Sequence, residues 1–154
     1  MTDILSAICA KIATIGRAIE GINVQGVYDP PPANLQSADL PAMFTWTGVA
    51  NHNVSALGEG FIETTRRFYV QVAVLPIGQG DPNTRETLVR PLIAAALIQF
   101  AKYPHFRDVN FVQKCVIVSD SGVIILPEYG GKYIGFEIAL DITYFAPRSF
   151  AAGE

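Results

Sequence analysis

The chain has 154 residues, of which 50% are hydrophobic and 16% are charged, and its formal net charge is −3. The length is typical of one domain, the negative charge argues against direct sequence-specific binding of nucleic acid, and no apolar run approaches the ~18 residues that a membrane span requires. The high apolar fraction favours a protein that buries surface against other subunits.

The chain begins with a predicted helix. Apolar residues recur at three- and four-residue spacing over residues 4–19, where Thr2 or Asp3 can cap the helix and Gly21 can end it. Residues 22–27 are then predicted to form a short strand. The run of three prolines that follows fixes φ and removes backbone donors, so it predicts an extended connector.

Residues 41–48 have the alternation of a second strand. The next segment, residues 49–60, contains several Asn, Ser and Gly residues, which predicts a flexible hairpin loop or the tip of an extended hairpin. Loops of this length usually have a function or are disordered.

A single long strand is predicted over residues 61–76, the most informative segment of the chain. Its apolar and polar residues alternate with period two, which indicates a strand with one buried face. Because strands usually run about five or six residues, we expect this one to overhang its sheet and to offer its polar face or its end to a partner. The apolar parity holds Ile62, Phe68, Val70, Val72 and Val74, and the polar parity holds Glu63, Thr65, Arg67, Tyr69 and Gln71.

The second helix has the strongest local signal in the chain. A Gly-Gln-Gly turn breaks the strand, Asp81 supplies a cap, and Pro82 fits the first helical position, where a missing N–H costs nothing. Pro91 removes one backbone hydrogen bond, so we expect it to kink the helix or to divide it near Arg90.

The remaining segments are predicted to be strands. Residues 111–118 and 123–126, joined by a turn at residues 119–122, predict a hairpin. The last strand, residues 132–145, has an uninterrupted apolar face of Ile134, Phe136, Ile138, Leu140, Ile142 and Tyr144, opposite Tyr133, Glu137, Asp141 and Thr143.

This order of elements predicts one α+β domain over residues 1–147. We expect an antiparallel or mixed sheet, two main helices packed on one of its faces, and a long β-hairpin. Residues 148–154 are predicted to form a frayed C-terminal tail.

The sequence has no motif for catalysis, a cofactor or a metal. His52 and His105 lie in separate predicted loops, and neither has a sequence-adjacent nucleophile or carboxylate. Cys9 and Cys115 match no metal spacing and are interpreted as reduced, buried thiols. We therefore predict no enzyme activity, no cofactor and no metal ion.

The charged residues of the two long strands allow several interpretations. Glu63, Glu137 and Asp141 could meet across the sheet as an acid/base or metal site. They could instead pair with Arg66 or Arg67, or contact another subunit, and we favour these uses. Arg66 shares the parity of the apolar residues, so it lies either near the strand end beyond the core or buried and paired, and we expect the first.

Several segments in their order resemble the tail terminator, or tail completion (minor tail), proteins of long-tailed bacteriophages. The resemblance covers nearly the whole chain. It includes the amphipathic first helix, the helix after the long strand, and three sequence segments: Leu40-Pro41-Ala42-Met43, GEGFIETTRRFYVQVAVLP at residues 58–76, and GFEIALDITYF at residues 135–145.

The resemblance implies a structural protein of the virion tail or neck, assembled in the bacterial host cytoplasm. It implies a ring of identical subunits, usually six, that caps the tail tube, ends its polymerisation and provides the joining surface to the head-side connector. The alternatives are a head-closure or neck connector component, another tail-tube or baseplate subunit, and, in a different class, a small enzyme or ligand-binding domain.

In such a ring each subunit uses two different patches, so complementary charge on its opposite sides is expected. The loop at residues 49–60 is a candidate arm that reaches a neighbouring subunit or the tube. The candidate contact residues are Glu63, Arg66, Arg67, Tyr69, Glu137 and Asp141 on the strands, and His52 and Asn53 in the loop.

Overall fold

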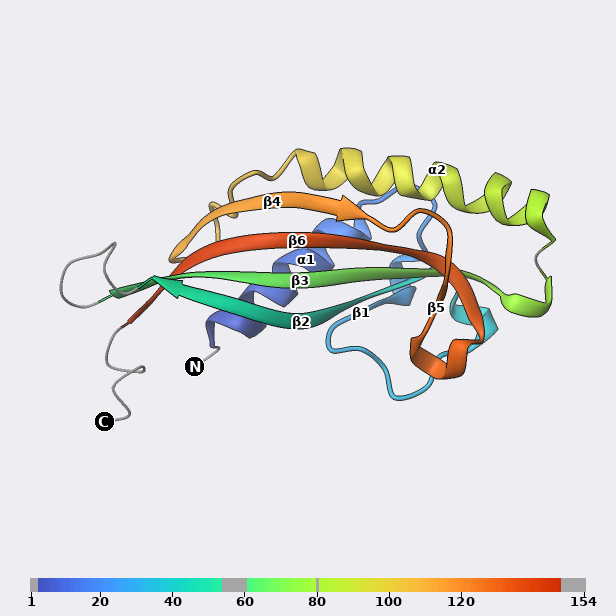
Figure 1. Ribbon diagram of the computed structural model, residues 1–154, viewed down its shortest axis with the longest axis horizontal. Coiled ribbons are helices and arrows are strands. Elements are labelled where there is room, and N and C mark those ends of the chain that lie inside the picture. The colour runs from blue at the N-terminus through green and yellow to red at the C-terminus, as the bar shows by residue number, and fades with distance from the viewer. Residues whose placement is uncertain (1–2, 54–60, 80, 148–154) are drawn as a thin grey trace.

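The computed structural model describes residues 3–53, 61–79 and 81–147. Within this part the chain forms two layers, a six-stranded sheet and a pair of α-helices (Figure 1). The predicted frayed tail, residues 148–154, lies outside the described residues. The helices are α1 (Ile4–Arg17) and α2 (Pro82–Ala101), and the strands are β1 (Val27–Tyr28), β2 (Ala42–Asn53), β3 (Phe61–Pro76), β4 (Val112–Asp120), β5 (Ile124–Leu126) and β6 (Tyr133–Pro147).

The sheet is mixed, as predicted. Its strand order is β1-β2-β3-β6-β4, with β5 pairing with β6 as well. Strand β1 runs parallel to β2, and every other pair is antiparallel. Strands β2 and β3 form the expected long hairpin, and the full length of β3 pairs with β6, so these two long strands lie at the centre of the sheet.

The main core lies between the helices and one face of the sheet. Alternate residues of β3 and β6 meet apolar residues of both helices there, which confirms the predicted placement of the two helices on one face. Each large side chain buried in this way stabilises the fold by roughly 1.5–3 kcal/mol. The core includes Ile8, Ile12 and Ile15 of α1, Val89, Leu92 and Phe100 of α2, and Phe68, Val70, Val72, Phe136, Ile138 and Leu140 of the sheet.

The helix caps follow the sequence signals. The Asp3 carboxylate accepts the N–H of Ser6 at 2.7 Å, and the Asp81 carboxylate accepts the N–H of Thr84 at 2.8 Å. However, α2 is not divided near Arg90 and continues as one helix through Pro91. The carbonyl that Pro91 leaves without a donor belongs to exposed Thr87, so water can satisfy it.

The predicted strand at residues 22–27 is wrong for most of its length. Residues Val24–Gly26 form a short 3₁₀ helix, because the Asn23 side chain accepts the N–H of Gln25 and turns the backbone. Only Val27 and Tyr28 pair with the sheet.

The predicted hairpin over residues 111–126 is also wrong. Strands β4 and β5 do not pair with each other; both run antiparallel to β6 and lie end to end along its edge. Ser121 bridges the gap between them, because its N–H donates to the carbonyl of Glu137 and its Oγ accepts the N–H of Glu137. The chain thus continues along β6 without reversing.

A second, smaller core lies on the other face of the sheet, near β1. Phe44 is fully buried there, with its ring edge-on to those of Trp46 and Tyr129. Tyr133, which the alternation assigned to the polar face, is buried in this cluster, and its hydroxyl donates to the carbonyl of Leu35. This core covers one end of the face that the sequence predicts to be polar.

No helix in the described residues is long and apolar enough to cross a membrane.

Candidate functional site

Beyond the second core, no helix of the described residues packs on the sheet face opposite α1 and α2, although Thr143 on this face is only 3% exposed. We call this region the open face and define it by Asn51, Thr65, Arg67, Asp141 and Thr143. Strands β2, β3 and β6 contribute these residues, and the register of β3 and β6 places Thr65 opposite Thr143 and Arg67 opposite Asp141. The open face therefore gathers residues that are far apart in the sequence.

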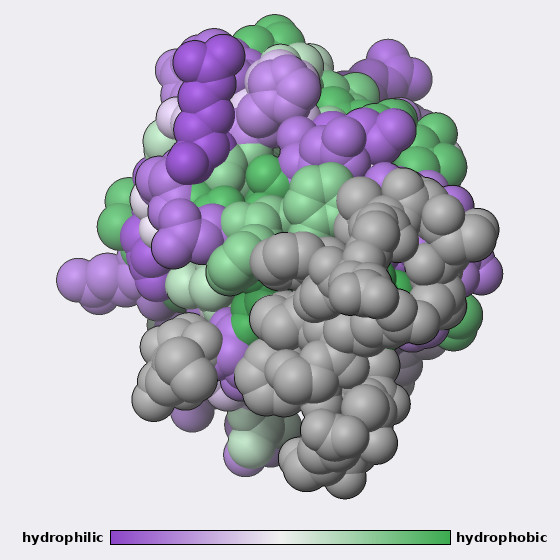
Figure 2. Space-filling view, turned by 90° about the vertical axis from the view of Figure 1, so that its left-hand side faces the viewer, coloured by the Kyte–Doolittle hydropathy of each residue, from purple (hydrophilic) through white to green (hydrophobic). Residues whose placement is uncertain are grey.

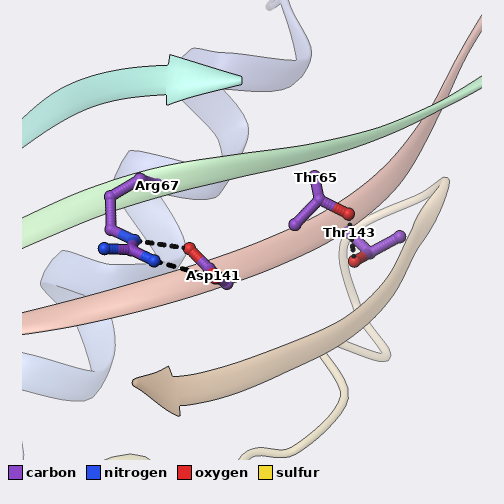
Figure 3. Close-up of polar contacts among 4 residues, drawn as sticks. All are labelled: Thr65, Arg67, Asp141 and Thr143. Atoms are coloured by element: carbon purple, nitrogen blue, oxygen red, sulfur yellow. Dashed lines mark hydrogen bonds and ion pairs between the residues drawn. The ribbon is translucent and has the colours of Figure 1, made fainter. Parts of the chain in front are cut away.

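Arg67 and Asp141 form a bidentate ion pair at the centre of the open face (Figure 3). Arg67 Nε donates to Asp141 Oδ1 at 2.6 Å, and Nη2 donates to Oδ2 at 3.2 Å. Hydrogen bonding to Asp141 raises the pKa of the Arg67 guanidinium above its usual value. The two hydrogen bonds hold both charges in fixed positions. The side chains are 35% and 31% exposed, so both charges remain accessible to a partner.

A second polar pair lies two residues further along the same strands. The hydroxyls of Thr65 and Thr143 lie 2.9 Å apart, on the same two strands as the ion pair (Figure 3). An open hollow of about 190 Å³ lies over this region. Its lining consists of Val49, Asn51, Thr65, Arg67, Tyr69 and Asp141.

Val49 and Asn51 reach this hollow because β2 extends further than the sequence predicts. Residues 49–53, assigned to a loop, belong to the strand, while residues 54–60 lie outside the described residues. The ladder with β3 shifts between Thr47 and Ala50, which is a β-bulge at Gly48 and Val49. The bulge reverses which residues face each side, and it places Asn51 beside Thr65.

Apart from Tyr69, which lines the same hollow, the other candidate residues are separated from the Arg67–Asp141 pair. Arg66 and His52 lie on the helix side of the sheet. Arg66 is half-buried, and its guanidinium donates to the Tyr144 hydroxyl at 3.1 Å and to the Gly48 carbonyl at 3.0 Å, which corresponds to the paired alternative. His52 Nδ1 lies 2.8 Å from the Thr64 hydroxyl.

Glu63 and Asn53 oppose each other at the end of the hairpin. Figure 2 looks onto this end of the molecule, where hydrophobic and hydrophilic residues both reach the surface. Phe111 lies at this end, because its carbonyl accepts the N–H of Phe145, and it is 49% exposed.

Glu137 belongs to a different network. The buried Gln71 amide donates to Glu137 at 2.8 Å and to Glu128 at 2.9 Å, and Gln71 Oε1 accepts the indole N–H of Trp46 at 2.7 Å. The register places Glu137 opposite Gln71, away from Asp141 and Glu63. The three carboxylates considered for one acid/base or metal site are therefore apart, and the described residues hold no group of three or more metal-ligating side chains.

A basic cavity beside the start of β4 is not evident from the sequence. It has a volume of about 500 Å³ and lies where α1 meets the segment after α2. Lys11 forms an ion pair with Asp108 at 2.9 Å and lies 5.0 Å from the centre of the Tyr103 ring, and its hydrogen bond lowers the pKa of Asp108. Lys102 and Arg107 provide the remaining cationic groups of the lining.

The two cysteines are free thiols, and Cys115 is buried as predicted, whereas Cys9 is only partly buried. Burial raises the pKa of both thiols, to about 12 for Cys115. At neutral pH Cys115 is therefore protonated, which suits its position in the main core.

The chain matches no known family model and no curated protein sequence.

Proposed function

We propose that this protein is a tail terminator of a long-tailed bacteriophage. Identical subunits, six in the arrangement that the resemblance implies, would form a ring that caps the tail tube, ends its polymerisation and provides the joining surface to the head-side connector. The segments that carry the resemblance correspond to the start of β2, to β3 and to β6, which are neighbours at the centre of the sheet.

The open face is the observation that carries the proposal. Both helices pack on the opposite face, so beyond the second core no helix of the described residues covers the polar sides of the two long strands. Arg67 is held there by Asp141 in a fixed geometry. A fixed, accessible charge on a rigid strand suits recognition of another subunit or of the tube, because little side-chain entropy is lost when the contact forms.

The proposal is tested by the solution mass of the purified protein together with negative-stain images of the protein mixed with tail tubes. The tubes are assembled from the tube protein encoded in the same genome. We expect rings at one end of the tubes. A protein that stays monomeric and leaves the tube ends bare would contradict the proposal. Because a terminator can stay monomeric until it meets the tube, the mixture is the decisive sample.

A further inference from the structure

We infer that neighbouring subunits join edge to edge, with the outer edge of β4 in one copy pairing with the outer edge of β2 in the next. In this arrangement Val116 of one copy lies beside Val49 of the other. The inference rests on the proposed ring and specifies its subunit contact.

Both outer edges of the sheet are open in the described residues. Strand β1 pairs with β2 only at Met43 and Phe44, so residues 45–49 of β2 have no strand partner on their outer side within the described part of the chain. On β4, the segment after α2 occupies two backbone groups, because the Gln113 carbonyl lies 2.9 Å from His105 Nδ1 and the Cys115 N–H donates to the Pro104 carbonyl. From Val116 to Asp120, β6 is the one strand among the described residues that pairs with β4. Unpaired strand edges present rows of N–H and C=O groups that favour pairing with another chain.

Strand directions favour this contact. Strand β2 is antiparallel to β3, β3 to β6, and β6 to β4, so β2 and β4 run in opposite directions. A rotation about an axis along the strands keeps the direction of every strand. It therefore brings β4 of one copy beside β2 of the next as an antiparallel pair, and repetition of the same contact closes a ring.

Exposed apolar side chains mark the same two edges. Val49 on β2 is 82% exposed, and Val116 and Val118 on β4 are 46% and 44% exposed, whereas no large exposed apolar residue is found among the described side chains of β3 and β6. Pairing would bury these valines at a subunit boundary, which accounts for their exposure on the isolated chain.

The edges also match in register. Val49 lies in the bulge beside Arg67, Arg67 is opposite Asp141, and Asp141 is opposite Val116, so these residues form one row across the open face. Continuing the row into the next copy brings Val116 to Val49. From this row, Val116–Asp120 of β4 runs along residues 45–49 of β2. In the opposite direction along the strands, the segment after α2 occupies β4, and the bulge bends β2 at the matching position.

Cysteine cross-linking tests the contact. The paired variant carries Val49→Cys and Val116→Cys in a background with Cys9→Ala and Cys115→Ala, and it is oxidised mildly with and without tail tubes. Directly opposed residues of antiparallel strands have Cα atoms about 4.5–5.5 Å apart, which a disulfide accommodates. We expect a ladder of covalent oligomers that ends at the ring number. The control pairs Val49→Cys with Ile98→Cys on α2, where Ile98 is 62% exposed, and we expect no ladder from it.

The outcomes of this experiment test the β4–β2 contact and the proposed terminator function separately. Rings on the tubes without a Val49–Val116 disulfide would overturn the contact and leave the proposed function standing. Covalent dimers from Val116→Cys alone would show that β4 pairs with itself, and would also overturn it. Bare tube ends would overturn both. If the paired variant does not fold, amide hydrogen exchange of the unaltered protein decides, because the contact requires new protection at residues 46–49 and 116–120 on assembly.

Discussion

Arg67 on β3 and Asp141 on β6 lie directly opposite each other, and two hydrogen bonds of 2.6 and 3.2 Å fix their side chains on the face of the sheet that the helices leave uncovered. Opposite charges on facing positions of neighbouring strands stabilise a sheet modestly. Since both side chains are partly exposed, we propose that the pair presents a charge to a partner and contributes little to folding.

Charge reversal at Arg67 should separate these roles. We expect Arg67→Glu to reduce ring or tube binding strongly, because the new carboxylate faces Asp141 and removes the fixed cation. Circular dichroism and the melting temperature of the isolated subunit should change little. Binding is measured by sedimentation with tail tubes.

Arg90→Glu is the matched control for this variant. Arg90 pairs with Glu86 on the exposed side of α2, so its reversal makes the same change in net charge away from the open face. We expect binding of this variant to be preserved. If Arg67→Glu lost fold and binding together, the ion pair would instead be a folding element; if both variants bound equally well, Arg67 would have no part in assembly.

The bulge in β2 should tolerate no side chain at Gly48. A Cβ added there would lie 2.8 Å from the Arg67 carbonyl oxygen and 2.9 Å from Tyr69 Cε2. Relieving such a clash costs roughly 1–3 kcal/mol in a well-packed region, so Gly48→Ala should unfold at lower urea concentration than the unaltered protein. Gly78→Ala is the control, because a Cβ at Gly78 meets nothing within 4 Å. Equal unfolding midpoints for the two variants would contradict this account of the bulge.

The bulge in β2 also explains why the sequence predicts only part of the open face. Alternation correctly predicted the buried faces of β3 and β6, because the helix-facing side of each strand is apolar for most of its length. It did not predict that Asn51 lies beside Thr65, because one extra residue at Gly48 and Val49 reverses the parity of β2. The partners of Arg67 also depend on the register between strands, which alternation does not define.

Two other features depend on tertiary contacts. The break between β4 and β5 has the composition of a turn, yet Ser121 bonds to Glu137 and the chain continues along β6. The second core buries Tyr133 and Gln71, which the alternation assigned to a polar face, because the segment before β2 and the residues near Tyr129 cover that end of the sheet.

The second core should contribute substantially to stability. Phe44 is fully buried between Trp46 and Tyr129, so Phe44→Ala removes a large aromatic contact and leaves a cavity. We expect a loss of roughly 3–5 kcal/mol in the free energy of unfolding, measured by urea denaturation. A loss close to zero would show that this cluster is not packed as described. Leu88→Ala on the exposed side of α2 is the control and should cost far less.

The Cys115 thiol should be unreactive in the folded protein. Burial raises its pKa to about 12, so at pH 8 roughly one molecule in ten thousand carries the reactive thiolate. We expect slow alkylation of Cys115 in the native protein and rapid alkylation in denaturant, followed by mass spectrometry of the labelled peptide. Rapid native labelling would contradict its placement in the core.

The raised pKa of Cys115 also has a consequence for stability. The unfolded thiol ionises near its usual value of 9.0, whereas the folded thiol does so at about 12. Its contribution is therefore fully present below about pH 9 and is lost as the pH rises toward 12. Cys115→Ala should remove this part of the alkaline loss, which denaturation curves across that range would detect.

We propose that this protein ends the growth of a tail tube, and tube length, followed while the tube protein polymerises, tests this proposal most directly. We predict that adding the protein stops elongation and leaves a ring at the capped end of each tube, whereas the Arg67→Glu variant lets tubes keep growing. Tubes that elongate equally fast and to equal lengths with and without the unaltered protein would contradict the claim.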